Sequence, residues 1–484
     1  MNNDIRQLEP IQLWNRFADL NEVPRASKKE ERVIAFMKNF GEQLGLETFI
    51  DEVGNVIIRK PATLGMEGRK PVVMQSHLDM VHQKNADTTF DFETQGIDMF
   101  VDGDWVKARG TTLGADNGLG VATIMAILES NEIEHPDIEA LFTIDEETGM
   151  TGAMGLEGGL LKGEILLNLD TEEDDEIGVG CAGGIDITAS RVYKQLAVPH
   201  NFTGYTIVVK GLNGGHSGMD IHKGLGNSNK IINRVLHAVS DFIRISEIDG
   251  GSLRNAIPRE SNAIIAFNEE NSEVVEGKLA LEINAIKNEL KTMEPNLDIT
   301  YSRTGTPSKM LDKNLSNNFI KSIYAAHNGV YRMSPDIPDL VETSNNIARV
   351  VVKDGEIKVL CLTRSSVESS KMDLANALKA TFELVGCEVE FSGSYPGWTP
   401  NMDSAILKVM RELYVQLNES QPHVAACHAG LECGILGTHY PNMDMISFGP
   451  NIKGAHSPDE RAQISSVQKY WKFVLEILKH IPKK

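Results

Sequence analysis

Cysteine is scarce in this chain, and no pair of cysteines is spaced as C-x-x-C. Five cysteines are scattered over 484 residues. Zinc ribbons, C-x-x-C redox centres and dense disulfide frameworks all need closely spaced pairs, so the sequence disfavours these classes. Cys427 and Cys433 flank the segment HAGLE closely enough for a metal site, but two buried thiols are the better interpretation. We therefore expect reduced cysteines in a cytoplasmic protein.

Long apolar runs and an excess of positive charge are also missing. No apolar segment approaches the ~18 residues of a membrane helix, and the N-terminus MNNDIRQLEP lacks the basic and apolar regions of a secretory signal. Lys and Arg number 47 against 68 Asp and Glu, which gives a formal net charge of −21. This charge disfavours nucleic acid and anionic membranes as partners. Most of it is typical of a solvated acidic surface.

The length of the chain predicts more than one domain, because 484 residues exceed a single ordinary core. The first part alternates predicted strands and helices, the middle changes to strand–helix–strand units, and the α/β character then returns. We predict an α/β catalytic domain formed by residues 1–190 and 395–484, with residues 191–394 inserted as an α+β lid domain. A weak duplication divides this lid into half-lids at about 200–305 and 306–394.

Seven acidic and imidazole side chains lie where predicted strands end or where a helix begins. The strands are predicted at 71–76, 138–144, 165–169 and 443–448, and the helix at 117–130. In open α/β sheets, ligands gather beyond the carboxyl ends of the strands, so we expect these side chains to meet at one edge. They are His77, Asp79, Asp116, Glu146, Glu147, Asp170 and His456.

This set of side chains predicts a metal-dependent hydrolase. Two imidazoles and three carboxylates can hold two divalent, zinc-like ions if one carboxylate bridges them. Two carboxylates remain, and metal hydrolysis has a use for both: one orients a ligating histidine, and the other takes a proton from water on the metal. The chain has no G-x-S-x-G nucleophile elbow, so no serine nucleophile is expected.

Five short motifs occur in an order that identifies a family resemblance. HLDMV, GADNG, EETG, LDTEE and AHSPDE make the chain similar to the co-catalytic zinc exopeptidases of the aminoacylase and carboxypeptidase G type. Longer segments, among them KGLNGGHSG, LRNAIPRE and HAGLECG, resemble the branch that cleaves Xaa-His dipeptides, and they span essentially the whole chain. The resemblance implies a mixed-sheet catalytic domain with an inserted lid. It also implies a cytoplasmic metallo-dipeptidase acting on Xaa-His and related unblocked dipeptides, carnosine among them.

The resemblance also assigns the metal ligands. Asp116 would bridge two ions, His77 and Asp170 would complete one site, and Glu147 and His456 would complete the other. Two Zn²⁺ per chain are expected, with Mn²⁺ or Co²⁺ as alternatives, because affinity order alone does not decide which metal a site takes.

Two further carboxylates receive catalytic roles from the same resemblance. Asp79 would hold His77 in its ligating orientation, and Glu146 would be the general base on a metal-bridging hydroxide and later the proton donor to the leaving amine. Alternatives of the same fold are an N-acyl-amino-acid deacylase and a tripeptidase. A non-catalytic peptide-binding protein is the remote alternative.

Four further residues, three of the middle region and Gly430 beyond it, would bind the substrate. His216 resembles the lid histidine that reaches the substrate's carbonyl oxygen, Asn255 and Arg364 would bind its C-terminal carboxylate, and Gly430 would offer a backbone N–H. Structural alternatives stay open: a histidine capping a glycine turn, a turn asparagine and a surface ion pair.

The size of the lid leads to a hypothesis about assembly. In relatives with a smaller lid this histidine comes from a partner subunit. Here the second half-lid would imitate that partner, so His216 would act within its own chain. The dipeptide substrate is then the expected partner, and a homodimer formed through other surfaces is left open.

Overall fold

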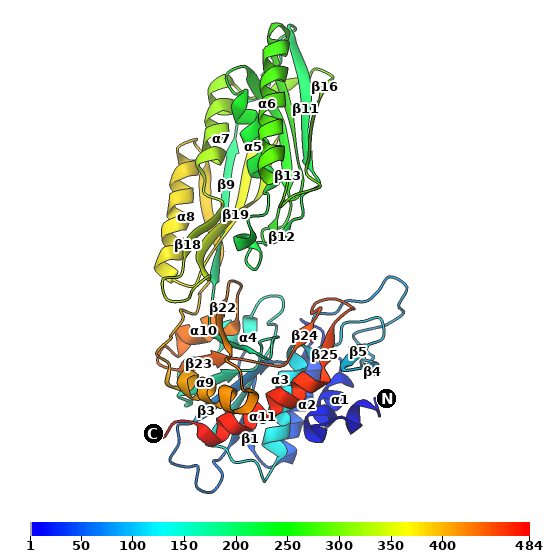
Figure 1. The fold of residues 1–484 in the computed structure, drawn as a ribbon, viewed down its shortest axis with the longest axis vertical. Coiled ribbons are helices and arrows are strands. Elements are labelled where there is room, and N and C mark those ends of the chain that lie inside the picture. Colours follow the sequence, from blue (N-terminus) through cyan, green and yellow to red (C-terminus); the bar gives the residue numbers. More distant parts are fainter. Residues whose placement is uncertain (1) are drawn as a thin grey trace. The chain divides into compact units, whose positions relative to one another are not determined.

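The computed structural model describes residues 2–484 and divides into two compact units (Figure 1). Unit 1 contains the chain up to Gly180 together with Pro400–Ala426 and Leu431–Lys484, and unit 2 contains Cys181–Thr399 and Cys427–Gly430. The first border lies ten residues before the predicted one at 190, because β9 (Gly183–Val192) pairs with two strands of unit 2.

An eight-stranded mixed sheet forms the centre of unit 1, with the strand order β1-β2-β6-β3-β7-β23-β8-β22. Its middle strands β6, β3, β7 and β23 run parallel to one another. Strands β3, β6 and β7 are buried along their whole length, which matches their nearly continuous apolar sequences and indicates cover on both faces. The sheet strands are β1 (Glu47–Ile50), β2 (Val56–Lys60), β3 (Val72–His77), β6 (Ile138–Thr143), β7 (Ile165–Asn168), β8 (Glu176–Cys181), β22 (His423–Cys427) and β23 (Asp444–Ser447).

Helices and a second, four-stranded sheet complete unit 1. The small sheet has the order β24-β25-β5-β4 and joins the loop after β23 to the loop before α3. Its strands are β4 (Met99–Asp102), β5 (Trp105–Ala108), β24 (Ile452–Lys453) and β25 (Arg461–Gln463). The helices are η1 (Ile5–Gln7), α1 (Ile11–Asn21), α2 (Glu31–Gln43), α3 (Ala115–Glu129), α4 (Thr151–Gly155), α9 (Ala405–Asn418), α10 (Glu432–His439) and α11 (Ile464–His480).

A nine-stranded antiparallel sheet forms the centre of unit 2. Most of its strands alternate buried and exposed residues, because α5–α8 cover one face and enclose a large apolar core with it (Figure 1). The strands follow the order β16 (Asp298–Thr304), β11 (Phe202–Lys210), β15 (Ser261–Asn268), β13 (Ile243–Gly251), β19 (Val341–Lys353), β20 (Glu356–Ser365), β9 and β21 (Glu388–Tyr395), with β18 (Gly329–Met333) on β19. The helices are η2 (Ile221–Lys223), α5 (Ser228–Ala238), η3 (Glu269–Asn271), α6 (Ser272–Leu290), α7 (Lys313–Ala325) and α8 (Glu368–Glu383).

Two halves of similar make-up can be distinguished within this sheet. Each half has four strands of the main order and two helices, and the halves meet where β13 pairs with β19. The second half takes β9 from the segment before residue 200. Two short ribbons stand beside the sheet, β10 (Leu196–Ala197) with β17 (Lys309–Met310) and β12 (Gly215–His216) with β14 (Ala256–Ile257).

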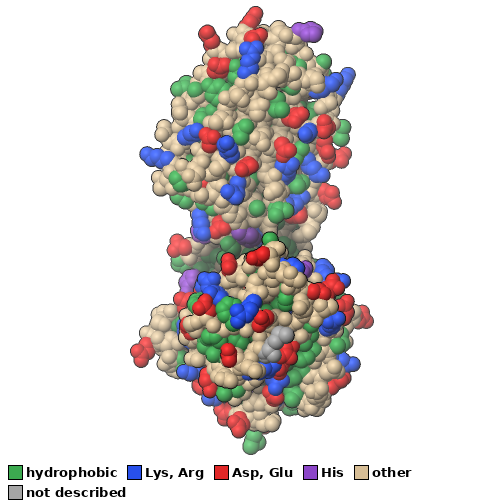
Figure 2. Space-filling model, turned by 90° about the vertical axis from the view of Figure 1, so that its right-hand side faces the viewer, with side chains coloured by type: hydrophobic (Ala, Val, Ile, Leu, Met, Phe, Trp, Pro, Cys, Tyr) green, Lys and Arg blue, Asp and Glu red, His purple; other side chains and the backbone are tan. Residues whose placement is uncertain are grey.

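The surface carries both signs of charge. Figure 2 shows acidic and basic side chains interspersed over the face of both units that it presents. Across residues 2–484, a helix long and apolar enough to span a membrane does not occur.

Candidate metal centre

The parallel strands of unit 1 deliver the predicted ligands to one edge of the sheet. His77 ends β3, the Glu146–Glu147 pair lies in the turn after β6, and Asp170 follows β7. The carboxyl ends of parallel strands meet at the same edge, so these side chains converge although the sequence separates them. Asp116 joins them from the start of α3, where its peptide bond to Asn117 is cis.

The last predicted ligand arrives through a loop. His456 lies between β24 and β25, in the left-handed backbone region with φ 62°. All five predicted ligands, together with Asp79 and Glu146, are thus collected in unit 1.

The five predicted ligands form two groups that share Asp116. His77 Nε2 lies 3.2 Å from Asp116 Oδ1 and 3.5 Å from Asp170 Oδ1. His456 Nε2 lies 3.2 Å from Asp116 Oδ2 and 3.0 Å from Glu147 Oε2. Within each group the candidate ligand atoms lie within 4.8 Å of one another. Each oxygen of Asp116 therefore faces a different histidine.

The charge of this cluster indicates a site for cations. Two histidines face the carboxylates of Asp116, Glu147 and Asp170, and these carboxylates are only 12%, 4% and 7% exposed. Glu147 Oε1 is buried and has no hydrogen-bond partner among the described residues. Nitrogen and oxygen donors of this kind suit Zn²⁺ and related divalent ions. The residues present therefore fit a two-metal centre.

The histidines respond to the same negative charge. Hydrogen bonds to Asp116 and Glu147 raise the pKa of His456 to about 11. Burial opposes the charged form of His77, but the charge of Asp170 and hydrogen bonds to Asp116, Asp170 and Asp79 raise its pKa well above the ordinary value. In the absence of metal, protonated imidazoles thus serve as the counter-charges of the cluster.

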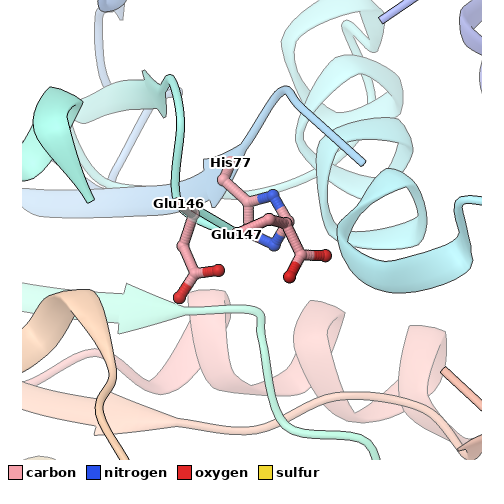
Figure 3. A group of neighbouring side chains, drawn as sticks. All are labelled: His77, Glu146 and Glu147. Carbon is pink, nitrogen blue, oxygen red and sulfur yellow. The ribbon is translucent and has the colours of Figure 1, made fainter. Parts of the chain in front are cut away.

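Glu146 is the neighbouring carboxylate outside the two groups that share Asp116. Figure 3 shows its carboxylate on one side of the His77 ring and that of Glu147 on the other. Burial raises the pKa of Glu146 well above its usual range, the positive charge of His77 lowers it, and neighbouring carboxylates raise it further. Like Glu147, it lies in the turn that follows β6, which ends at Thr143.

The carboxylate of Asp79 holds both the His77 ring and the Glu146–Glu147 turn in place. Its Oδ1 lies 3.3 Å from His77 Nδ1, and the same carboxylate accepts the backbone N–H groups of Glu146 and Glu147 at 3.0 and 3.3 Å. Burial opposes ionisation of Asp79, but the hydrogen bond and charge of His77 lower its pKa below the usual value.

Two supporting residues were not predicted from the sequence. Glu460 is buried and accepts the backbone N–H groups of residues 113–116 at 2.7–3.1 Å, so it holds the start of α3. Arg25, also buried, donates to the carbonyls of Leu78 and Asp79 at 3.2 Å. Both side chains bind backbone groups, and such contacts produce no recognisable spacing of residue types in the sequence. The only hint for Glu460 is its place in the AHSPDE motif.

Besides the groups that contain His77 or His456, one purely acidic group includes Asp79. Oxygens of Glu30, Asp79 and Asp145 lie within 4.8 Å of one another. The Nζ atom of Lys28 lies 2.8 Å from Asp145 Oδ2, and Lys28 N–H donates to Glu30. These contacts account for the group without an ion.

The predicted substrate residues all belong to unit 2. His216 pairs with Ala256 in the β12–β14 ribbon, and its Nδ1 accepts the N–H groups of Gly218 and Met219 at 3.2 and 3.1 Å. Burial and the charge of Arg364 lower the pKa of this ring. These two bonds are those of a histidine that caps the glycine turn, the alternative named above, and the lowered pKa favours a neutral ring with Nδ1 as the acceptor.

The other three substrate candidates differ in environment. Arg364 is 5% exposed near the end of β20 and donates to Tyr395 OH at 2.7 Å, so it is not the surface ion pair left open above. Asn255 lies exposed in the turn before β14 and accepts Ser217 N–H with its carbonyl at 2.8 Å. Gly430 ends the 427–430 segment of unit 2 and is half-buried.

The fold and this centre define a metallopeptidase, and the comparison with known families agrees. The model of peptidase family M20/M25/M40 matches residues 73–480, and the chain belongs to this family.

Among its relatives, the chain is 44% identical over 484 residues to the cytosol non-specific dipeptidase of Escherichia coli (strain K12), covering 100% of both chains. It also resembles the crystal structure of aminoacylhistidine dipeptidase from Vibrio alginolyticus, with a TM-score of 0.94, 44% identity and coverage of 99% and 98% of the two chains. Aminopeptidase PepT from Bacillus cereus ATCC 10987 shares the fold alone, with a TM-score of 0.58, 16% identity and coverage of 98% and 99%.

Proposed function

We propose that this chain is a cytoplasmic, metal-dependent dipeptidase that hydrolyses Xaa-His and related unblocked dipeptides, carnosine among them. The pair of ligand groups sharing Asp116 carries the proposal, because they sit beside an unused carboxylate, Glu146. Full-length similarity to relatives named cytosol non-specific dipeptidase and aminoacylhistidine dipeptidase supports the substrate class and the location.

His77, Asp116 and Asp170 are proposed to hold one ion, and Asp116, Glu147 and His456 the other. Two divalent cations bound there, Zn²⁺ by preference with Mn²⁺ or Co²⁺ as alternatives, would acidify a water molecule and polarise the scissile carbonyl.

The general base is proposed to be Glu146. Its carboxylate takes the proton of the attacking water and delivers it to the leaving nitrogen, a role typically worth ~10²–10⁴-fold in rate. Burial, which raises the pKa of Glu146, suits a group that must accept and then return a proton. Asp79 fixes the backbone of the base and the ring of His77 at once.

Four residues of unit 2 are proposed to bind the dipeptide. Two backbone N–H groups occupy Nδ1 of His216, so the ring carries its proton on Nε2, where it can donate to the substrate's carbonyl oxygen. Arg364 can pair with the C-terminal carboxylate through a planar fork, with Asn255 and the N–H of Gly430 as further donors. The dipeptide is the proposed partner; a homodimer is the alternative, which sedimentation of the purified protein decides.

The test is a substrate panel with metal-loaded protein. Carnosine, Gly-His and Leu-Leu should be cleaved, whereas N-acetyl-Gly-His and a tripeptide should not, and Glu146→Gln should abolish turnover while keeping the metal. Cleavage chiefly of the acetylated substrate would identify a deacylase instead. Cleavage of the tripeptide would identify a tripeptidase, and binding without turnover would identify a non-catalytic protein.

A further inference from the structure

Glu432 is a buried acid that has no part in the roles above. It begins α10 in unit 1 and is 0% exposed. Its Oε2 accepts hydrogen bonds from Gln75 Nε2 at 2.6 Å and from Thr143 Oγ1 at 2.7 Å. No Lys, Arg or His side chain of residues 2–484 forms an ion pair with it. A fully buried carboxyl group with only neutral donors needs an explanation.

The two donors lie just below the metal centre. Gln75 precedes His77 by two residues on β3, and Thr143 ends β6 just before the turn that carries Glu146. Residues two apart on a strand point to the same face, so Gln75 and His77 share one face of the sheet. In addition, Thr143 is the register partner of His77. Glu432 thus joins the ends of two ligand-bearing strands.

A row of buried hydrogen bonds extends this connection to a third strand. Asn168 Nδ2 donates to Gln75 Oε1 at 2.6 Å, and Ser447 Oγ donates to Asn168 Oδ1 at 2.5 Å. Asn168 is the register partner of Gln75, and Ser447 is the register partner of Asn168. Asn168 also precedes the ligand Asp170 by two residues. The row therefore crosses four adjacent strands directly beneath the site.

The second carboxyl oxygen of Glu432, Oε1, lacks the donors that Oε2 has. Oε1 is buried and has no hydrogen-bond partner among the described residues. Burial raises the pKa of Glu432 to about 8, which favours a protonated group near neutral pH. Because Oε2 already accepts two donors, the proton belongs on Oε1.

We propose that Glu432 is a positioning residue: through Gln75 and Thr143 its Oε2 ties the ends of β3 and β6 together, and it thereby holds the turn after β6 that carries Glu146. This inference rests on the proposed function for the role of Glu146 as base. Glu432 itself touches neither substrate nor metal. Its effect is to fix the distance and direction of the base relative to His77, where small displacements have large effects on rate.

The test compares Glu432→Ala with the near-isosteric Glu432→Gln. A glutamine keeps an oxygen that accepts from Gln75 and Thr143 and places an N–H donor where Oε1–H lies. We expect Glu432→Ala to lose kcat by about 100-fold, the effect of a misplaced group, with KM and metal content unchanged. The kcat of Glu432→Gln should stay within about threefold of the parent value. This change is smaller than the loss of one charge-assisted hydrogen bond would cause.

A matched control comes from the beginning of β6, the strand that ends at Thr143. Glu139 on β6 is also buried and accepts the N–H groups of Lys162 and Gly163 at 2.6 and 2.9 Å. Glu139→Ala should lower thermal stability without lowering kcat. Full kcat in Glu432→Ala, equal loss in Glu432→Ala and Glu432→Gln, or a change confined to KM would each overturn the proposal.

Two readouts keep the result independent of folding and of the proposed function. If Glu432→Ala gives no soluble protein, Thr143→Val removes one donor to Oε2 at similar shape and should lower kcat about tenfold, whereas unchanged kcat would overturn the proposal. If the parent turns over no dipeptide, the proposed function fails by itself. Infrared spectroscopy then decides: the parent should show the carbonyl band of a buried protonated acid that Glu432→Gln lacks, and a missing band would overturn the proposal.

Discussion

The Oδ1 atom of Asp79 accepts a hydrogen bond of 3.0 Å from the backbone N–H of Glu146. The same carboxylate faces the Nδ1 atom of His77 at 3.3 Å. One buried side chain therefore sets the position of a proposed metal ligand and of the proposed base together. The backbone N–H of Glu147 donates to its Oδ2 at 3.3 Å, and because an ionised carboxylate is acceptor-only, each of these three contacts needs a donor that points at Asp79.

Replacing Asp79 by asparagine should weaken both parts of the site. The amide offers one acceptor oxygen, and wherever its NH₂ group replaces a carboxylate oxygen, every donor that faced this oxygen now faces another donor. Outer-shell partners of this kind typically contribute 10–100-fold to metal affinity or activity, and we expect Asp79→Asn to lose about that much in kcat. Steady-state kinetics and metal titration by calorimetry measure the two effects separately.

Asp51 provides the matched control for Asp79. Its Oδ1 also accepts backbone N–H groups, from Val53, Gly54 and Asn55 at 3.1, 2.9 and 2.8 Å, in the turn between β1 and β2. Asp51→Asn should lower stability by about 1–3 kcal/mol, the effect of an unsatisfied donor, and leave kcat unchanged. Equal losses of kcat in both variants would contradict a specific role of Asp79.

Removing the metal should destabilise the protein. Ions that bind only the folded state stabilise it by about 4 kcal/mol at a free concentration a thousand times Kd. Chelator-treated protein should therefore unfold at lower urea concentration, and adding Zn²⁺ should restore the midpoint. Asp116→Asn removes the carboxylate shared by both groups, so we expect at most one ion per chain by elemental analysis and a smaller Zn²⁺ effect.

Asp104 serves as the control for that experiment. It is an exposed carboxylate that accepts Ser465 N–H at 3.0 Å near the start of α11. Asp104→Asn should bind as much metal as the parent. If the parent protein unfolds at the same urea concentration with and without Zn²⁺, the folded state does not bind the ion tightly enough to be stabilised by it.

Much of unit 1 could be predicted because its central strands are short, buried and apolar. The runs predicted at 138–144 and 165–169 became β6 and β7 within a residue, and each is followed by a predicted ligand. In a parallel sheet, knowing where strands end is enough to know which side chains meet. The convergence of His77, Glu146 and Glu147 at the ends of β3 and β6 was therefore accessible from the sequence.

Unit 2 could be predicted only in part. The apolar run at 347–353 indicates a strand, but β19 begins at Val341, because the polar residues 342–346 are buried as well. They bond across the sheet, as between Thr363 and Asn345 at 3.0 Å. Polar side chains that satisfy one another in the interior do not show in a hydrophobic pattern. The strand β13 was not predicted, although a short turn through Ser240 and Asp241 separates it from α5.

Arg364 should control substrate affinity rather than the chemical step. A lysine keeps the charge but lacks the planar fork, so we expect Arg364→Lys to raise KM for Gly-His by about 10–100-fold, the range for a lost hydrogen bond between charged groups. Gly-His amide lacks the carboxylate, so parent and variant should handle it alike. Measuring kcat and KM for both substrates isolates the contact.

The control for Arg364 is another arginine of the same unit. Arg254 donates to the carbonyls of Ile187 and Cys361 at 3.0 and 2.7 Å, and it is not among the proposed substrate residues. Arg254→Lys should lower stability and leave KM unchanged. If Arg364→Lys raises KM equally for the amide, the residue does not read the carboxylate.

His428 should make the stability of unit 2 sensitive to acid. It is buried, its Nε2 lies 2.8 Å from Ser344 Oγ, and burial together with the charge of Arg364 lowers its pKa to about 3. An unfolded histidine titrates near 6.5, so between about pH 6.5 and 3 the unfolded chain binds the extra proton. Stability is therefore complete above about pH 6.5 and falls as the pH is lowered through this window.

Substituting His428 should remove that dependence. From pH 7 to pH 5 the parent should lose about 2 kcal/mol more unfolding free energy than His428→Gln, by proton linkage at a single site. Urea unfolding of both proteins at the two pH values measures the difference, and subtraction cancels the other titrating groups. His237→Gln, an exposed site on α5 of the same unit, should behave as the parent. Parallel pH dependence in parent and His428→Gln would mean that His428 takes up its proton without unfolding.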